Sequence, residues 1–270
     1  MLLEVPQPLL WKEKTMNNYA LRIAYDGSRY CGWQIQKIKK GSKRIPASIQ
    51  GTISQALKKI LGEQVNLVGS GRTDSGVHAL GQVAHFKSRT VLAVERIQAA
   101  LNAVLPGDIR ILSCQKAPHN FHARFDALSK VYRYYIHNEI YSSAFLRKHA
   151  YWYKHPLALA AMKRASRYLT GKHDFRAFCA SGSGVAHTVR SVKRITISRE
   201  NIFGAQCICI EIEADGFLYN MVRNIIGTLI DVGRKRRTPQ YMKEVLRNKE
   251  RSFAGPCVPA KGLFLMKVNY

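Results

Sequence analysis

The segment GSGRTDSGVHALGQVAHF, residues 69–86, contains a glycine-rich loop between two stretches of alternating apolar residues. Residues 64–69 (QVNLVG) precede the loop and residues 81–87 (GQVAHFK) follow it, and the alternation predicts a β-strand on each side. The glycines allow the backbone to turn tightly and to approach a ligand closely. We therefore expect a loop with a function, held between two strands.

The elements outside this pair of strands complete a β-α-β-β-α-β unit. Before it, residues 19–25 alternate as a strand, and residues 48–61 carry apolar residues at helical spacing, with Ser48 as the N-cap. After it, residues 93–105 predict a helix and residues 109–115 predict a strand.

The second half of the chain repeats this order, with strands at 130–137, 190–198, 205–214 and 263–270 and helices at 156–169 and 218–233. An additional helix at 239–248 precedes the last strand. We therefore expect an α+β fold of two tandem ferredoxin-like (RRM-like) halves with antiparallel sheets and a cleft between them. The expected domains are residues 17–120, which carry the glycine-rich loop, and residues 121–270.

Charge indicates the chemistry of the partner. The chain has 43 Lys and Arg residues against 17 Asp and Glu residues, a formal net charge of +26 over 270 residues. A polyanion best neutralises such an excess, so nucleic acid is the leading candidate. No apolar run approaches the roughly 18 residues of a membrane span, so we expect no membrane partner. The segment MLLEVPQPLLW (1–11) has no basic leader, which predicts a cytoplasmic protein without a signal peptide.

The cysteines and histidines predict neither disulfides nor a metal site. The six cysteines include no C-x-x-C pair, and Cys207 and Cys209 fall on one face of a predicted strand, where a disulfide between them is disfavoured. His119 and His122 lie close together, but no second ligand pair follows at a suitable spacing. We therefore expect reduced thiols and no metal.

Six segments of the chain form a distinctive ordered set: YDGSRYCGWQ (25–34), GRTDSGVHALGQVAHF (71–86), FHARFDALSKVYRYYI (121–136), GKHDFRAF (171–178), DGFLYNMVRNIIGTL (215–229) and PAKGLFL (259–265). The set resembles the motifs of the tRNA pseudouridine synthase A family and covers nearly all of the chain from about residue 19 onward. Six ordered matches are far more specific than a lone glycine-rich motif.

The resemblance implies an isomerase that converts uridine to pseudouridine in the anticodon arm of tRNA, at positions thirty-eight to forty, without cofactor or metal. It also implies a homodimer in which one tRNA contacts both subunits. Asp74 matches the catalytic aspartate, Arg223 the arginine that pairs with it, and Tyr132 the tyrosine that stacks on the flipped uracil. Arg72 matches the arginine that fills the space of the flipped base, and Leu263 the leucine under the uracil.

The chemistry explains why these residue types are needed. The reaction breaks the bond from N1 to the ribose, turns the uracil and joins C5 to the sugar. The Asp74 carboxylate can attack C1′, add to C6 or remove a ribose proton, and the sequence leaves these three roles open. The nucleotide must leave its stack, and the space it vacates and the displaced phosphates must be stabilised. The planar guanidinium of Arg72 can do this, because it can both stack and bind phosphate. Arg223 would favour the charged form of Asp74, so we expect the two side chains within salt-bridge distance.

Each of these residues also has a purely structural interpretation. Asp74 could cap a turn, Tyr132 could pack in the core, and Arg223 could be a solvated residue beside an apolar helix stripe. His78 and His85 are expected to be structural, because no proposed step requires an imidazole.

Three features depart from the family pattern. Ser75 stands where alanine is more usual, GPCVPAKGL (255–263) is a variant approach to the final Gly-Leu pair, and residues 37–48 form a long basic connection. We expect this connection to contact tRNA phosphates without reading bases, because its cationic residues are accompanied by no aromatic side chain: Lys37, Lys39, Lys40, Lys43 and Arg44.

Two other functions agree with the charge. A non-catalytic protein of two RRM-like units would bind RNA, but the chain contains no RNP1 motif. A basic structural component of a ribonucleoprotein would give no reason for the set of Arg72, Asp74, Tyr132 and Arg223.

Overall fold

The structure is a computed structural model that describes residues 16–36, 47–180 and 187–270. Its N-terminal elements are β1 (Asn17–Tyr25), α1 (Ile49–Leu61), β2 (Val68–Gly69), β3 (His78–Ser88), α2 (Val94–Val104) and β4 (Ile109–Ala117). Its C-terminal elements are β5 (Ser129–His137), β6 (Tyr151–Trp152), α3 (Leu159–Ser166), β7 (Gly171–Asp174), β8 (Val189–Ile202), β9 (Ala205–Ala214), α4 (Met221–Gly233), α5 (Tyr241–Asn248) and β10 (Leu263–Asn269).

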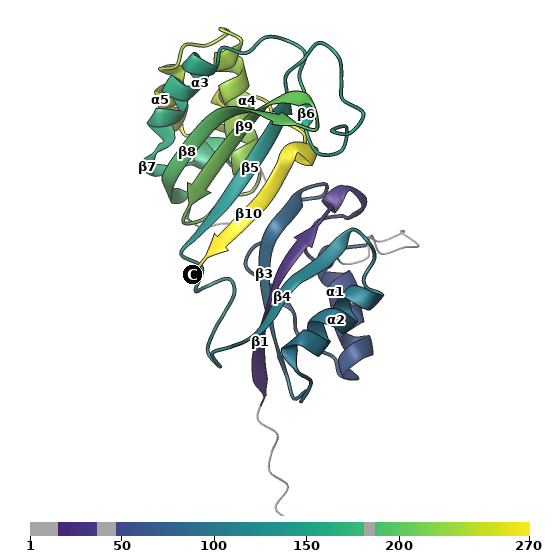
Figure 1. Cartoon of the computed structure of the whole chain (residues 1–270). Coiled ribbons are helices and arrows are strands. Elements are labelled where there is room, and N and C mark those ends of the chain that lie inside the picture. The colour runs from purple at the N-terminus through teal and green to yellow at the C-terminus, as the bar shows by residue number, and fades with distance from the viewer. Residues whose placement is uncertain (1–15, 37–46, 181–186) are drawn as a thin grey trace, which may run out of the picture.

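These elements form a mixed α+β fold around one large, mostly antiparallel sheet. The strand order is β4-β1-β3-β10-β5-β9-β8-β7, with β2 paired to β3 and β6 paired to β5. The helices form two groups, α1 with α2 beside the N-terminal strands and α3, α4 and α5 beside the C-terminal strands (Figure 1). None of the helices in the described part of the chain is long and apolar enough to cross a membrane.

Helix α1 shows how sequence and packing agree in the N-terminal group. The Ser48 side chain accepts a hydrogen bond from the backbone N–H of Gly51 and caps the first turn, as the sequence predicted. Ile49, Ile53 and Leu57 follow at helical spacing and are completely buried. Each such side chain contributes about 1.5–3 kcal/mol through burial, and this fixes the helix on the sheet.

Helix α4, in the C-terminal group, carries the site residue Arg223 and is buried along most of its length. Its apolar residues Met221, Ile225 and Leu229 are completely buried, and so is Asn224. The Asn224 side chain donates to the carbonyl of Phe178, which satisfies the buried amide. The N-terminal turn of α4 is therefore rigidly placed.

One feature differs from the prediction of separate antiparallel sheets. β3 and β10 are parallel neighbours, with Phe264 opposite His78 and Leu265 opposite Ala79. This pairing joins the strands of both halves into a single sheet. The physical reason is that an edge strand exposes unpaired backbone groups, and the two edges satisfy each other here.

Two boundaries also differ, and two short strands are additional. The strand predicted at 64–69 is reduced to β2, and the helix predicted at 156–169 consists of α3 followed by a 3-10 turn at Arg167–Leu169. The short strands β6 and β7 were not predicted, because two to four residues carry too little periodicity.

Candidate active site

The loop between β2 and β3 presents Asp74 on a tight turn. The backbone N–H of Val77 donates to the carbonyl of Asp74 at 3.1 Å, and Gly76 has a φ of 76°. A positive φ at the third position of such a turn favours glycine, because a Cβ would be strained there. The turn thus holds Asp74 at the tip of the loop.

The YDGSRYCGWQ segment (25–34) supports this loop from behind. The Trp33 backbone N–H donates to the carbonyl of Thr73 at 3.0 Å, and the Tyr25 hydroxyl lies 2.8 Å from Thr73 Oγ1. A Cβ added to Gly69 would lie 2.6 Å from the Trp33 ring. The missing side chain of Gly69 therefore makes room for the indole of Trp33, so this glycine serves packing within the protein.

Ser75, the departure from the family pattern, has a local role. Its hydroxyl donates to the carbonyl of Tyr30 at 3.1 Å, which ties the loop to the same supporting segment. The side chain of Ser75 is exposed. Ser75 thus helps to hold the residue next to Asp74 against this segment.

Asp74 and Arg223 form an ion pair, and the predicted salt-bridge distance is confirmed. Arg223 Nη1 lies 3.5 Å from Asp74 Oδ2. Arg223 is fixed by two further hydrogen bonds, from Nη1 to Asn220 Oδ1 at 2.7 Å and from Nε to the Val258 carbonyl at 2.8 Å. Asn220 itself has a φ of 58°, a conformation that asparagine tolerates better than most residues. Arg223 is thus anchored independently of the carboxylate.

The protonation of Asp74 reflects two opposing effects. Burial raises the pKa of the Asp74 carboxyl, and the charge of Arg223 lowers it, but burial is the larger effect, so the pKa lies above its ordinary value. The sequence indicates only the effect of the arginine, because burial depends on the fold. Because the side chain of Asp74 is 29% exposed, its carboxylate remains accessible to a reactant.

Tyr132 and Leu263 lie on neighbouring strands near this pair. Tyr132 is on β5, is 8% exposed, and packs edge-on against Phe217 at a ring distance of 4.9 Å. Burial raises the pKa of Tyr132, and the charge of Asp74 adds to that rise. Leu263 is buried at the start of β10 and is opposite Tyr134, so it shares a face of the sheet with Tyr132. An apolar wall of this kind suits a planar ring.

Of the other candidates, Arg72 is exposed on the loop, two residues before Asp74. Lys37, Lys39, Lys40, Lys43 and Arg44 lie outside the described residues. Their expected contacts with RNA phosphates stay a prediction.

Two residues that the sequence did not single out hold the loop. The Lys130 ammonium donates to the carbonyl of Ser70 at 2.7 Å. The fully buried Gln82 amide accepts from the Ser70 hydroxyl at 2.7 Å and donates to the Gly71 carbonyl at 3.0 Å. Both residues occur in the quoted segments, but a lysine or glutamine in a strand gives no signal of its partner.

His78 and His85 have structural contacts. His78 Nδ1 accepts from the Gly27 backbone N–H at 3.1 Å, so its Nε2 carries the proton that faces the Lys148 carbonyl, also at 3.1 Å. His85 Nδ1 accepts from the Ala123 backbone N–H at 3.1 Å. Burial lowers the pKa of both rings, so the neutral forms dominate.

His78 also belongs to a cluster with Asp26 and His149, whose potential ligand atoms lie within 4.8 Å of one another. His149 Nε2 is 3.1 Å from Asp26 Oδ2. Because both ring nitrogens of His78 already have partners, this cluster works as a hydrogen-bonded clasp between the loop before β6 and the segment after β1.

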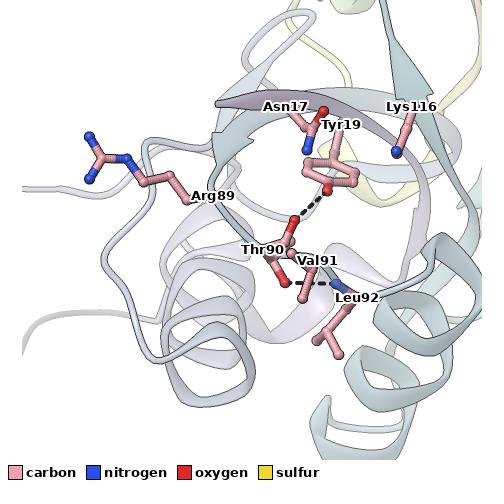
Figure 2. A pocket seen from close by; sticks show the side chains of 7 residues that line it. All are labelled: Asn17, Tyr19, Arg89, Thr90, Val91, Leu92 and Lys116. Atoms are coloured by element: carbon pink, nitrogen blue, oxygen red, sulfur yellow. Dashed lines mark hydrogen bonds between the residues drawn. The ribbon is translucent and has the colours of Figure 1, made fainter. Parts of the chain in front are cut away.

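A surface pocket of about 290 Å³ lies elsewhere, beside the start of β1 (Figure 2). Two of its lining residues are hydrogen-bonded, because the Tyr19 hydroxyl donates to the Thr90 carbonyl. Its lining contains none of the candidate catalytic residues: Asn17, Tyr19, Arg89, Thr90, Val91, Leu92 and Lys116. We therefore do not assign the reaction to it.

Comparison with known proteins gives a consistent result. The sequence model of a family described as tRNA pseudouridine synthase matches residues 22–126 and 165–270. A tRNA pseudouridine synthase A of Caldicellulosiruptor bescii is 45% identical over 94% of this chain and 100% of its own length. A tRNA pseudouridine synthase A of Moorella thermoacetica is 44% identical over 93% of this chain and 98% of its own length. The ranges that the family model matches include Arg72, Asp74, Arg223 and Leu263, and Tyr132 lies between them.

Proposed function

Because this chain belongs to the tRNA pseudouridine synthase family, an isomerase family that acts on tRNA, we propose that it converts uridine to pseudouridine in the anticodon stem-loop, at positions thirty-eight to forty. Asp74 is the catalytic group, Arg223 its charge partner, and Tyr132 and Leu263 bind the uracil. Arg72 occupies the space that the flipped nucleotide leaves. The anticodon arm and the roles of these residues rest on the motif resemblance.

The single observation that carries this proposal is the Asp74–Arg223 ion pair. A carboxylate at a loop tip and a guanidinium at a helix terminus meet at 3.5 Å although they are far apart in the chain. Arg223 is already held by Asn220 and Val258, so it needs no carboxylate for its own placement. The pair lies near the apolar surface of Tyr132 and Leu263. A reaction that needs an accessible carboxylate next to a planar ring would use such an arrangement.

The atoms of the reaction balance without a co-substrate. The bond from C1′ to N1 breaks, the bond from C1′ to C5 forms, and a proton leaves C5 while one is taken up at N1. We assign to Asp74 the attack on the ribose or on the ring, and to the ring and hydroxyl of Tyr132 the contact with the uracil as it turns. Both residues act while the base is outside the stack, since a paired base presents neither C1′ nor C6 to a side chain.

We infer the finer domain architecture from the strand orders. β1 lies between β4 and β3, and β5 lies between β10 and β9, so each half has its first strand between its last and its third. The second strands, β2 and β8, pair with β3 and β9. This order supports two ferredoxin-like halves, residues 17–120 and 121–270. We place the active site in a cleft between them, because Asp74 belongs to one half and its partner Arg223 to the other.

A homodimer is also proposed. Ile140, Tyr141 and Phe145, in the segment after β5, are each more than 70% exposed, and Phe203 beside them is 79% exposed. The rings of Phe145 and Phe203 lie 6.5 Å apart. A cluster of exposed aromatic side chains suits a second copy of the chain, which sedimentation equilibrium of wild type and a Phe145→Asp, Phe203→Asp variant would test.

The proposed function is tested by incubating the purified chain with unmodified tRNA transcripts and mapping pseudouridine by reverse-transcription stops after carbodiimide treatment. We expect modification confined to positions thirty-eight to forty. Tight tRNA binding without any pseudouridine would instead support a non-catalytic RNA-binding protein. A cytoplasmic location stays a prediction.

A further inference from the structure

Lys130 is a cation in an unusual environment. Its ammonium is half-buried and donates to the Ser70 carbonyl at 2.7 Å. A Cβ added to Gly71 would lie 3.0 Å from its Nζ, so the catalytic loop passes directly over the ammonium. An ammonium has three donors, and the Ser70 carbonyl is its one acceptor among the residues that the structure describes.

The charges around Lys130 have the same sign as its own. Burial lowers the pKa of Lys130, and Arg124 and Arg190 lower it further, to about 8. No carboxylate of the described residues lies within ion-pair distance of its Nζ. The nearest acidic side chain along the neighbouring strand, Glu213, is opposite Val131 and therefore lies on the other face, where Ser129 and Asn269 donate to it.

Sheet register brings Lys130 and Arg190 together on the site's face. Lys130 is opposite Ala214 of β9, and Val192 of β8 is opposite the same residue from the other side. Arg190, two residues before Val192, shares that face, and Tyr132, two residues after Lys130, shares it as well. Arg190 also lies against Gly216, because its Nε would be 3.2 Å from a Cβ added there, and Gly216 is the residue before Phe217, whose ring packs on Tyr132.

We propose that Lys130 and Arg190, assisted by Arg124, form a phosphate-binding subsite that takes a backbone phosphate of the RNA strand beside the nucleotide to be modified. This inference rests on the proposed function, because it names the group that the RNA presents next to Asp74. The positive charges of Lys130, Arg190 and Arg124 repel one another and destabilise the free protein. A bound phosphate would neutralise this repulsion. Two free N–H groups of Lys130 supply the donors.

The test uses the titration of Lys130. A bound phosphate favours the ammonium, so RNA binding must take up a proton whenever the free amine is neutral. Wild-type affinity for an unmodified tRNA transcript should therefore fall up to about tenfold between pH 7 and pH 9, because a pKa of about 8 leaves roughly one amine in ten protonated at pH 9. Lys130→Arg keeps the charge at every pH, so its affinity should not show this fall.

Two further variants test the inference in case Lys130→Arg disturbs the packing of the loop at Ser70 and Gly71. Lys130→Met should bind tRNA more weakly at pH 7 and lower the slope of log K against log salt by roughly 0.7–0.9. Arg190→Gln leaves the Lys130–Ser70 contact intact and removes one neighbouring cation, so the pH at which affinity falls should move upward. The matched control is Lys116→Met on the edge strand β4, which should keep the wild-type pH dependence.

The inference is overturned if wild type and Lys130→Arg show the same dependence of tRNA affinity on pH, or if Lys130→Met keeps the wild-type affinity and salt slope. These binding measurements need no turnover. A wild-type chain that forms no pseudouridine would therefore contradict the proposed function without affecting the result for the subsite.

Discussion

Arg223 Nη1 lies 3.5 Å from Asp74 Oδ2, and this contact joins the loop before β3 to the first turn of α4. The arginine is anchored by Asn220 and Val258, whereas Asp74 is placed by the turn that Gly76 closes. Each partner is thus positioned by its own local structure. The pair therefore places a carboxylate in a partly buried site, and neither partner needs the other to keep its position.

We first predict that Asp74→Asn reduces pseudouridine formation by roughly 10⁴-fold or more, because the amide keeps the shape but cannot act as nucleophile or base. Affinity for tRNA should stay near wild type. The melting temperature should not fall, since burial raises the pKa of Asp74 and its charge is therefore costly in the folded state. Ser75→Ala is the control and should keep near-wild-type turnover. Turnover of Asp74→Asn close to the wild-type rate would exclude Asp74 as the catalytic group.

The second prediction concerns the pH dependence of the chemical step. Arg223→Gln removes the charge that lowers the pKa of Asp74 and leaves burial, which raises it, so the carboxyl should gain its proton at a higher pH. The acid limb of the single-turnover rate should shift upward in pH, with a lower maximal rate. Arg29→Gln, which removes an exposed ion pair with Asp108, is the control and should leave the limb in place. An unchanged limb in Arg223→Gln would show that another group sets it.

The sequence predicted those features that depend on local pattern. The helix at 48–61 and its Ser48 cap followed from spacing and capping, and the contact of Asp74 with Arg223 followed from the motifs. The parallel pairing of β3 with β10 did not, because two strands far apart in sequence carry no mark of their partner. The same limit applies to Lys130, since its acceptor is a backbone carbonyl in another segment.

A third prediction separates the ring of Tyr132 from its hydroxyl. Tyr132→Phe keeps the edge-on contact with Phe217, so folding and tRNA binding should be retained while the rate of the chemical step falls. Tyr132→Ala removes a buried ring and should lower the free energy of unfolding by about 3–5 kcal/mol. Urea unfolding and single-turnover rates measure the two effects. If Tyr132→Phe turns over like wild type, the hydroxyl takes no part in the reaction.

A fourth prediction concerns the clasp of Asp26 with His149. Burial alone would raise the pKa of Asp26, but hydrogen bonds from Ser28 and His149 outweigh it and lower the pKa to about 2. A lowered carboxyl pKa stabilises the folded state above the unfolded value and loses that effect as pH falls toward 2. Asp26→Asn should therefore lower the melting temperature at pH 7, and the difference from wild type should shrink between pH 5 and pH 3.

The exposed Glu250 provides the control for this clasp, and Glu250→Gln should change the melting temperature little at either pH. A difference between wild type and Asp26→Asn that stays constant from pH 7 to pH 3 would mean that the charge of Asp26 is not what stabilises the clasp.

The last prediction concerns the basic connection at residues 37–48, which rests on the sequence alone because residues 37–46 lie outside the described part of the chain. It carries five cationic residues and no aromatic one, so we expect it to position tRNA through phosphates: Lys37, Lys39, Lys40, Lys43 and Arg44. A Lys39→Ala, Lys40→Ala variant should weaken binding of different tRNAs about equally and reduce the salt slope by roughly 0.7–0.9 per lost contact. The rate on bound tRNA should hardly change. Unlike Lys130→Arg, this variant should keep the wild-type fall in affinity between pH 7 and pH 9, because it leaves the amine that titrates there untouched. An unchanged salt slope would mean that the connection is a solvated basic loop.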